Sequence, residues 1–135
     1  MRYFPLLVCV SVLSMIGLTA TGCSDNSTAL APFEPEVSNV PDSFSMQATG
    51  VVGVTTTVTY TWSNSATRAS INHSTTVDAG SASLVVKDDA GTIVYDKDLE
   101  PSLNEPTAVG VAGNWTIEVS LTNYSGTLNF LAQAL

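Results

Sequence analysis

Apolar side chains occupy every second position over residues 115–121 and again over residues 128–134 of this 135-residue chain. An alternation with a period of two is typical of a β-strand that has one buried and one solvated face. The pattern is interrupted at residues 123–126, Asn-Tyr-Ser-Gly, so it predicts two strands joined by a turn. An isolated hairpin is at best marginally stable in water, and its apolar face is therefore expected to meet a second sheet. The apolar positions are Trp115, Ile117, Val119, Leu121, Leu128, Phe130, Ala132 and Ala134.

The same period recurs upstream, and no helical period is found. It predicts strands over residues 43–50, 54–62, 68–77, 82–87, 92–96 and 107–111, with the first closed by Gly50 and a loop at 98–106. The strands at 82–87 and 92–96 form a hairpin through residues 88–91, in which Gly91 supplies the left-handed conformation of the turn. Seven or eight short strands predict an all-β, antiparallel β-sandwich, jelly-roll-like, over residues 43–135.

Residues 23–42 are rich in Ser, Asn, Pro and acidic side chains. Pro32, Pro35 and Pro41 interrupt any helix or ladder that would run through this stretch. It is interpreted as a flexible tether. An alternative is that Phe33 and Val37 dock on the domain as an edge segment.

Residues 1–22 have the composition of an export signal. A basic start at Arg2 is followed by an apolar run to Leu18 that is too short to span a bilayer comfortably, and then by small residues. The segment Ala20-Thr21-Gly22-Cys23 resembles the lipobox of bacterial lipoproteins. That resemblance implies a lipid on Cys23, which anchors the protein to the cell envelope. In that family Ser24, in place of an aspartate, favours the outer membrane if the organism has one.

An ordinary signal peptide cut near Ala20 or Gly22 is the alternative. It would leave Cys23 as a free thiol or paired with a second chain, because Cys9 lies in the removed segment.

The charge of the chain limits its partners. It carries a net charge of −8, which becomes −9 once residues 1–22, with Arg2, are removed. Nucleic acid is not expected as a partner, because phosphate binding requires clustered Lys and Arg. The same charge repels anionic headgroups, so the lipid is the expected membrane contact.

The segment Gly113-Asn114-Trp115-Thr116-Ile117-Glu118-Val119, followed by Ser125-Gly126-Thr127-Leu128, resembles the end of the P-domain and pre-peptidase C-terminal jelly rolls. Those domains accompany secreted proteases and are accessory and non-catalytic. The resemblance covers about 20 residues and implies the architecture alone.

No catalytic constellation is apparent, and an enzyme is not expected. His73 is the sole histidine, and it is interpreted as a hydrogen-bonded strand residue rather than a base or ligand. A hydrolase would need a placed Ser-His-Asp set, for instance by convergence of His73 with Asp88 and Asp96 in one cleft. Thiol chemistry is excluded if Cys23 is acylated.

Oxygen-rich and aromatic positions supply the remaining candidates. Asp88, Asp89, Asp96 and Asp98 flank one predicted hairpin and are candidate calcium ligands, although solvated turn aspartates are the favoured interpretation. The threonines at 55, 57, 59 and 61 share one strand face, which is interpreted as solvent-facing rather than as an ice- or sugar-binding array. Tyr60, Trp62 and Trp115 lie on apolar parity and are interpreted as core rather than as sugar-stacking platforms.

These observations predict a lipid-anchored, non-enzymatic module of the cell envelope that binds a protein or a polymer such as a polysaccharide. No cofactor other than the covalent lipid is expected. The alternatives are a carbohydrate-binding module, which needs an exposed tryptophan on a flat sheet, and a calcium-stabilised accessory domain of a secreted hydrolase system.

Overall fold

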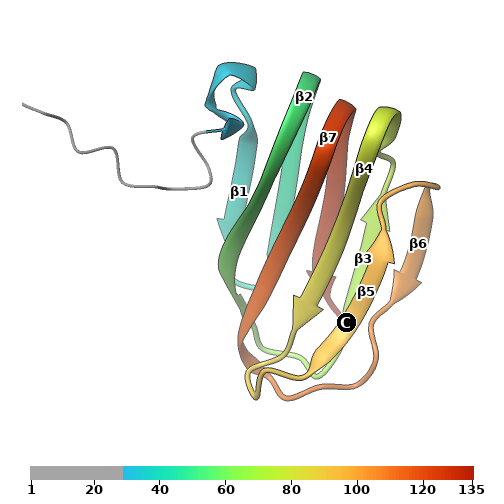
Figure 1. Cartoon of the computed structure of the whole chain (residues 1–135). Helices are drawn as coiled ribbons and strands as arrows, with labels where there is room; N and C mark the ends of the chain where they lie inside the picture. Colours follow the sequence, from blue (N-terminus) through green and yellow to red (C-terminus); the bar gives the residue numbers. More distant parts are fainter. Residues whose placement is uncertain (1–28) are drawn as a thin grey trace, which may run out of the picture.

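Antiparallel β-strands make up most of the chain in this computed structural model, which describes residues 29–135 (Figure 1). In chain order the elements are the 3-10 turn η2 (Ala31–Phe33), β1 (Glu36–Val40), β2 (Ser43–Asn64), β3 (Ala69–His73), β4 (Thr76–Lys87), β5 (Ile93–Asp98), β6 (Leu103–Pro106) and β7 (Gly113–Ala134). Each of these strands pairs with its neighbours in the antiparallel sense. Within this part of the chain no helix has the length and apolar character needed to cross a membrane.

Two long strands fold the sheet over on itself. β2 and β7 each contain 22 residues and pair with one another from Ser43↔Gln133 to Asn64↔Gly113. One layer holds β1, the first half of β2, the second half of β7, β3 and β6, and the other holds the second half of β2, the first half of β7, β4 and β5 (Figure 1). The antiparallel β-sandwich that the alternation predicts is therefore confirmed.

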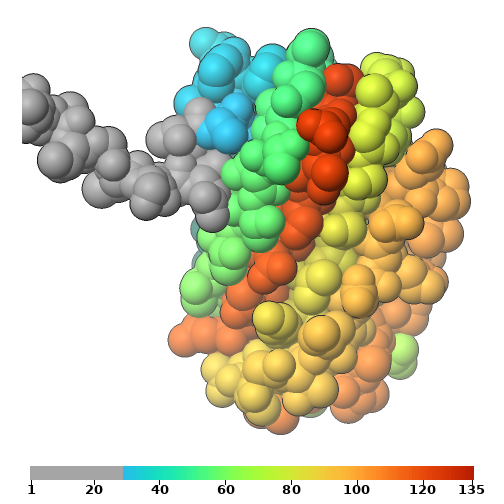
Figure 2. Space-filling view, in the orientation of Figure 1, coloured from blue at the N-terminus to red at the C-terminus, as the bar shows by residue number. Residues whose placement is uncertain are grey.

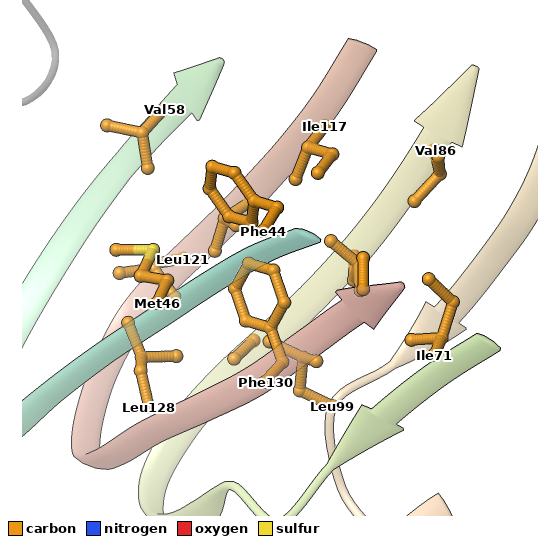
Figure 3. Packing of buried hydrophobic residues seen from close by; sticks show 14 of the residues in the cluster. Phe44, Met46, Val58, Ile71, Val86, Leu99, Ile117, Leu121, Leu128 and Phe130 are labelled. Atoms are coloured by element: carbon orange, nitrogen blue, oxygen red, sulfur yellow. The ribbon is translucent and has the colours of Figure 1, made fainter. Parts of the chain in front are cut away.

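The core lies between the two layers and is filled by the inward side chains of both halves of the long strands (Figure 3). Phe44 and Tyr60 belong to the same strand, yet their ring centroids are 5.1 Å apart, because β2 faces itself across the core. The rings of Trp62 and Trp115 meet edge to face at 6.0 Å. Both tryptophans are fully buried, as the parity of the alternation predicts.

The predicted C-terminal hairpin is wrong. Residues 123–126 do not reverse the chain, and β7 continues through them with both of its halves paired to β2. Asn123 (φ 44°) and Gly126 (φ 149°) bend the strand from one layer to the other, while β2 bends opposite them through register shifts between Ala48 and Thr56. Gly50 likewise bends β2 and does not end a strand.

The predicted tether reaches too far along the chain. β1 pairs with β2 from Glu36↔Gln47 to Val40↔Ser43, and Leu30 is 1% exposed within the core cluster. The turn after β1 is held by Asp42, whose carboxylate accepts bonds from the Ser65 N–H (2.7 Å) and hydroxyl (2.8 Å). The prolines at 35 and 41 flank a strand of five residues and do not interrupt it, so the alternative of a docked edge segment is the correct one. Residues 1–28, which include the predicted signal peptide and Cys23, lie outside the described residues.

In the middle of the chain, the strands of the structure agree with the predicted strands only in part. The hairpin at residues 88–91 is confirmed, since β4 pairs with β5 and Gly91 has a φ of 81°. The strand expected at 107–111 is instead a loop, and a strand, β6, lies inside the expected loop at 98–106. Loop residues bond laterally to other segments, for example Thr107 N to Ala69 O (2.8 Å) and Gly110 N to Thr67 O (2.7 Å), so alternation there does not reflect a strand.

Candidate functional site

The four aspartates flanking the β4–β5 hairpin do not converge. Asp88 is 4% exposed, and its Oδ1 accepts bonds from the N–H groups of Ala90 (3.1 Å) and Thr92 (2.8 Å), while Oδ2 accepts one from Val111 (2.9 Å). Asp89 Oδ1 accepts a bond from the Asn114 N–H (3.0 Å). Asp96 and Asp98 are exposed on β5.

The geometry of Asp88 explains its role. The backbone N–H of Val111, followed by those of the turn, stabilises the carboxylate and lowers the pKa of Asp88 against the opposing effect of burial. Both oxygens are occupied by backbone donors that join the hairpin turn to the segment before β7. Among residues 29–135 no group of three or more His, Cys, Asp or Glu side chains is placed to hold a metal ion. The arrangement is that of a structural clamp.

His73 is buried in the first layer, with 1% of its surface exposed. Its Nδ1 lies 3.0 Å from the carbonyl oxygen of Leu99, and its Nε2 lies 3.1 Å from the hydroxyl of Tyr95. Because a carbonyl can only accept, Nδ1 carries the proton and Nε2 accepts the Tyr95 hydroxyl. The interpretation of His73 as a hydrogen-bonded strand residue is confirmed.

Tyr95 and Glu105 complete this polar cluster, and neither is singled out by the sequence pattern. Burial, reinforced by the neighbouring Glu105 carboxylate, raises the pKa of Tyr95. Glu105 also lies 3.7 Å from Lys97 Nζ. The cluster ties β3, β5 and β6 together beneath the surface and contains no nucleophile. The partners of His73 are Tyr95 and Leu99, whereas those of Asp88 lie in the hairpin turn and the segment before β7, so the two residues belong to separate clusters.

Tyr60, Trp62 and Trp115 do not form a surface platform. Trp62 Nε1 donates to Val40 O (3.2 Å) and Trp115 Nε1 donates to Val111 O (2.8 Å), so the polar atom of each buried indole is satisfied. Tyr60 is half-buried and packs against the core cluster. Neither tryptophan is available to stack on a sugar from solvent.

A groove of about 600 Å³ crosses the outer surface of the first layer. Two cross-strand rows of side chains build it: Glu36, Gln47 and Asn129 form one row, and Ser38, Ser45 and Leu131 form the other. The lining also includes Val37, Met46 and Phe130, which alternate with these rows.

The chemistry of the groove is that of amides and hydroxyls, with a single carboxylate at Glu36. Asn129 Nδ2 donates to Ser74 Oγ (3.0 Å), and this bond orients the amide so that Oδ1 is its remaining acceptor. Leu131 is half-buried and supplies an apolar patch. Sequence reasoning missed this site because Ser38 lay in the expected tether, and because polar residues on the solvent side of strands carry no distinguishing signal.

On the outer face of the second layer, the threonines of β2 lie beside residues of β7 and β4. Its cross-strand rows are Thr57–Ser120–Ser83, Thr59–Glu118–Val85 and Thr61–Thr116–Lys87. Thr57 and Ser120 hydroxyls lie 3.4 Å apart. Charged and apolar side chains interrupt the hydroxyls, so this face is not a uniform hydroxyl array.

No protein-family model matches the chain, and a search of curated proteins finds no significant match.

Proposed function

We propose that this protein is a lipid-anchored, non-enzymatic binding module of the bacterial cell envelope, and that its groove holds an uncharged, hydroxyl-rich polymer of the glycan class. The lining of the groove carries this proposal. Amide and hydroxyl side chains from three adjacent strands present both donors and acceptors, which suits the hydroxyl groups of a sugar chain.

The negative charge of the chain and of the groove supports the proposal of an uncharged ligand. The chain has a net charge of −8, and among residues 29–135 the only ionisable side chain that lines the groove is the carboxylate of Glu36. An anionic polymer would be repelled, and none of the described residues that line the groove is basic and able to compensate for it. Because the tryptophans are buried, recognition depends on hydrogen bonds rather than on stacking.

The ionisable clusters support a non-enzymatic role. His73 and Asp88 are committed to bonds within the protein, and neither lines the groove. The anchor rests on the resemblance of residues 20–23 to a lipobox, and an anchored module with an outward polar groove would hold an envelope polymer close to the membrane.

Co-sedimentation of the full chain with insoluble neutral polysaccharide from the envelope tests the ligand. Gln47→Ala is expected to weaken binding by about 2- to 10-fold, because one hydrogen bond contributes about 0.5–1.5 kcal/mol. Gln133→Ala is the matched control, since Gln133 is also exposed on the outer face of the first layer but does not line the groove.

Two outcomes would contradict the proposal. One is equal loss of binding in both variants, which would separate binding from the groove. The other is retention of the chain only by a protease-sensitive component of the envelope, which would identify a protein partner.

A further inference from the structure

One of the two rows of side chains that build the groove continues beyond it. The groove lies on β1, β2 and β7, and the first layer extends from β7 to β3 and then to β6. The register places Asn72 of β3 beside Leu131, which lines the groove, and places Asn104 of β6 beside Asn72. The row that starts at Ser38 and Ser45 therefore crosses all five strands and ends in two exposed asparagines.

The other row of the groove also continues onto the next segment. The Ser74 N–H donates to the carbonyl oxygen of Asn129 (3.0 Å), and Asn129 Nδ2 donates to the Ser74 hydroxyl (3.0 Å). Ser74 thus adds a hydroxyl to the row of Glu36, Gln47 and Asn129. With about 4.8 Å between neighbouring strands, the three strands of the groove span about 10 Å and all five span about 19 Å.

The amides along these rows have hydrogen-bonding groups left for a ligand. Gln47 and Asn72 are exposed, and no hydrogen bond joins either side chain to another of residues 29–135. Asn104 Oδ1 accepts a bond from the Ser70 hydroxyl (3.3 Å), which leaves its Nδ2 as a donor toward solvent. Donors and acceptors are therefore presented at both ends of the row as well as in the groove.

The asparagines are unusual residues for these positions, because asparagine is disfavoured in strands. Asn72, Asn104 and Asn129 nevertheless lie on three adjacent strands of this outer face. Figure 2 shows the outer face of the second layer, where β2 (green), β7 (red) and β4 (yellow) lie side by side and where strand-favouring threonines alternate with Glu118 and Lys87. Residues that break a local preference without a gain in packing are typical of functional surfaces.

We propose that the glycan site continues from the groove across β3 to Asn104 on β6, so that the ligand is an extended chain that lies across the strands. This inference rests on the proposed function of the groove. Each strand adds an amide, a hydroxyl or, at Leu131, an apolar contact, so a polymer of repeating units meets a repeating series of partners. A short unit would fill the groove but leave Asn72 and Asn104 without a contact.

The charge of the rows favours an uncharged chain as the occupant. Glu36 is their one ionisable residue, and it lies at the β1 end. From Gln47 to Asn104 the rows hold only amides, hydroxyls and Leu131, although the chain as a whole carries twelve Asp and Glu residues. A charged polymer would find no opposite charge along this path.

Fragments of the neutral envelope polysaccharide, sorted by length after partial hydrolysis, test the extension. Calorimetry with the full chain in detergent is expected to show tighter binding of long fragments than of short ones. Asn72→Val should weaken the binding of long fragments by about 2- to 10-fold, the loss of one hydrogen bond, and should leave short fragments unaffected. Its melting temperature should not fall, because valine favours a strand.

Two variants serve as controls. Asn114→Val makes the same replacement at an exposed position of β7 in the second layer, and it should leave the binding of all fragments unchanged. Gln47→Ala removes an amide inside the groove and should weaken the binding of short and long fragments alike.

The outcomes separate this inference from the proposed function. Long fragments that bind Asn72→Val as well as the natural chain, while Gln47→Ala weakens both lengths, would end the site at the groove and overturn the inference alone. A loss of long-fragment binding in Gln133→Ala in place of Asn72→Val would turn the ligand along the strands and overturn it as well. Absence of binding at every length would remove both the proposed function and the extension.

Discussion

Asp88 uses both carboxylate oxygens to hold backbone N–H groups from two segments that are distant in sequence. The turn at residues 88–91 supplies one set of donors and Val111 supplies the other, so one side chain fixes the loop that leads into β7. Asp42 acts in the same way at the turn after β1, where the Ser65 backbone N–H is the largest cause of its lowered pKa. At this scale the carboxylates of Asp42 and Asp88 stabilise irregular backbone.

The clamp predicts a pH dependence of stability. The folded-state pKa of Asp88 is lowered below the unfolded value of about 3.9, so its contribution is fully present above that pH and is lost as the pH falls through the folded pKa. Asp88→Asn is therefore expected to lower the melting temperature at pH 7, and the difference from the natural protein should shrink in strong acid. Thermal melts across pH 2–7 measure this.

Asp96→Asn is the control, because Asp96 is exposed on β5. A melting temperature lowered equally by both substitutions would show that net charge, and not the clamp, sets the stability.

At the scale of elements, the bends of β2 and β7 decide the architecture. Residues 123–126 have the composition of a turn, and the backbone does take positive φ there, but both flanking segments pair with β2 and not with each other. A residue with positive φ serves a turn or a bend equally well, and the neighbouring strand determines which one forms.

Gly126 makes the bend testable. A Cβ at this position would overlap the Thr76 carbonyl oxygen, in addition to the strain of its positive φ. Gly126→Ala is expected to destabilise the protein by roughly 2–4 kcal/mol in chemical denaturation.

Gly53→Ala is the matched comparison, because Gly53 also has a positive φ (60°), but no atom lies within 4 Å of the place that a Cβ would occupy there. It is expected to cost only about 1–2 kcal/mol, the cost of the left-handed backbone. Equal effects would mean that β7 does not approach β4 closely at this bend.

The segment before β2 is a second element whose role is measurable. Leu30 is 1% exposed and belongs to the core cluster, so Leu30→Ala is expected to cost about 2–5 kcal/mol. Leu135 is 65% exposed, and Leu135→Ala should change stability little. Denaturant titration of both full-length variants distinguishes the two, and matching midpoints would restore the tether interpretation for residue 30.

At the scale of the whole molecule, the sandwich is closed on its core while its outer faces remain polar. The ionisable clusters lie beneath the surface, and the groove lies on the outer surface of the layer that holds β1. The proposed ligand site is therefore separate from the outer face of the second layer, and a substitution at Thr57 is expected to leave ligand binding unchanged.

In the proposed lipoprotein, membrane attachment depends on Cys23. Cys23→Ala is expected to move the protein from the detergent phase to the aqueous phase, or to leave it as an unprocessed precursor, because two or more acyl chains hold a protein firmly. The sandwich should keep its melting temperature, since the core cluster is built from residues 30–132.

Phase partitioning measures membrane attachment, and mass spectrometry of the mature N-terminus identifies the first residue and its modification. A natural protein that partitions into the aqueous phase, with Cys23 unmodified or with another first residue, would contradict the lipoprotein proposal.

The local pattern alone determined the all-β class, the antiparallel sandwich, the hairpin at residues 88–91 and the inward side of β7, where Trp115, Ile117, Val119 and Leu121 are all buried. Side chains alternate every two residues along any strand, so a short window of sequence reveals which of them face the core. The buried state of His73 also follows from parity, because it alternates in phase with Ile71.

Apart from the β4–β5 hairpin, the strand partners were decided only by the tertiary structure. Ser43 pairs with Gln133, and Glu36 joins a row with Gln47 and Asn129, so these contacts link residues that no local window contains. The bend at residues 123–126, the docking of β1, the partners of His73 and the groove all depend on such pairs. A period of two specifies which face of a strand is buried, but several antiparallel arrangements bury the same faces, and only packing of the complete core selects among them.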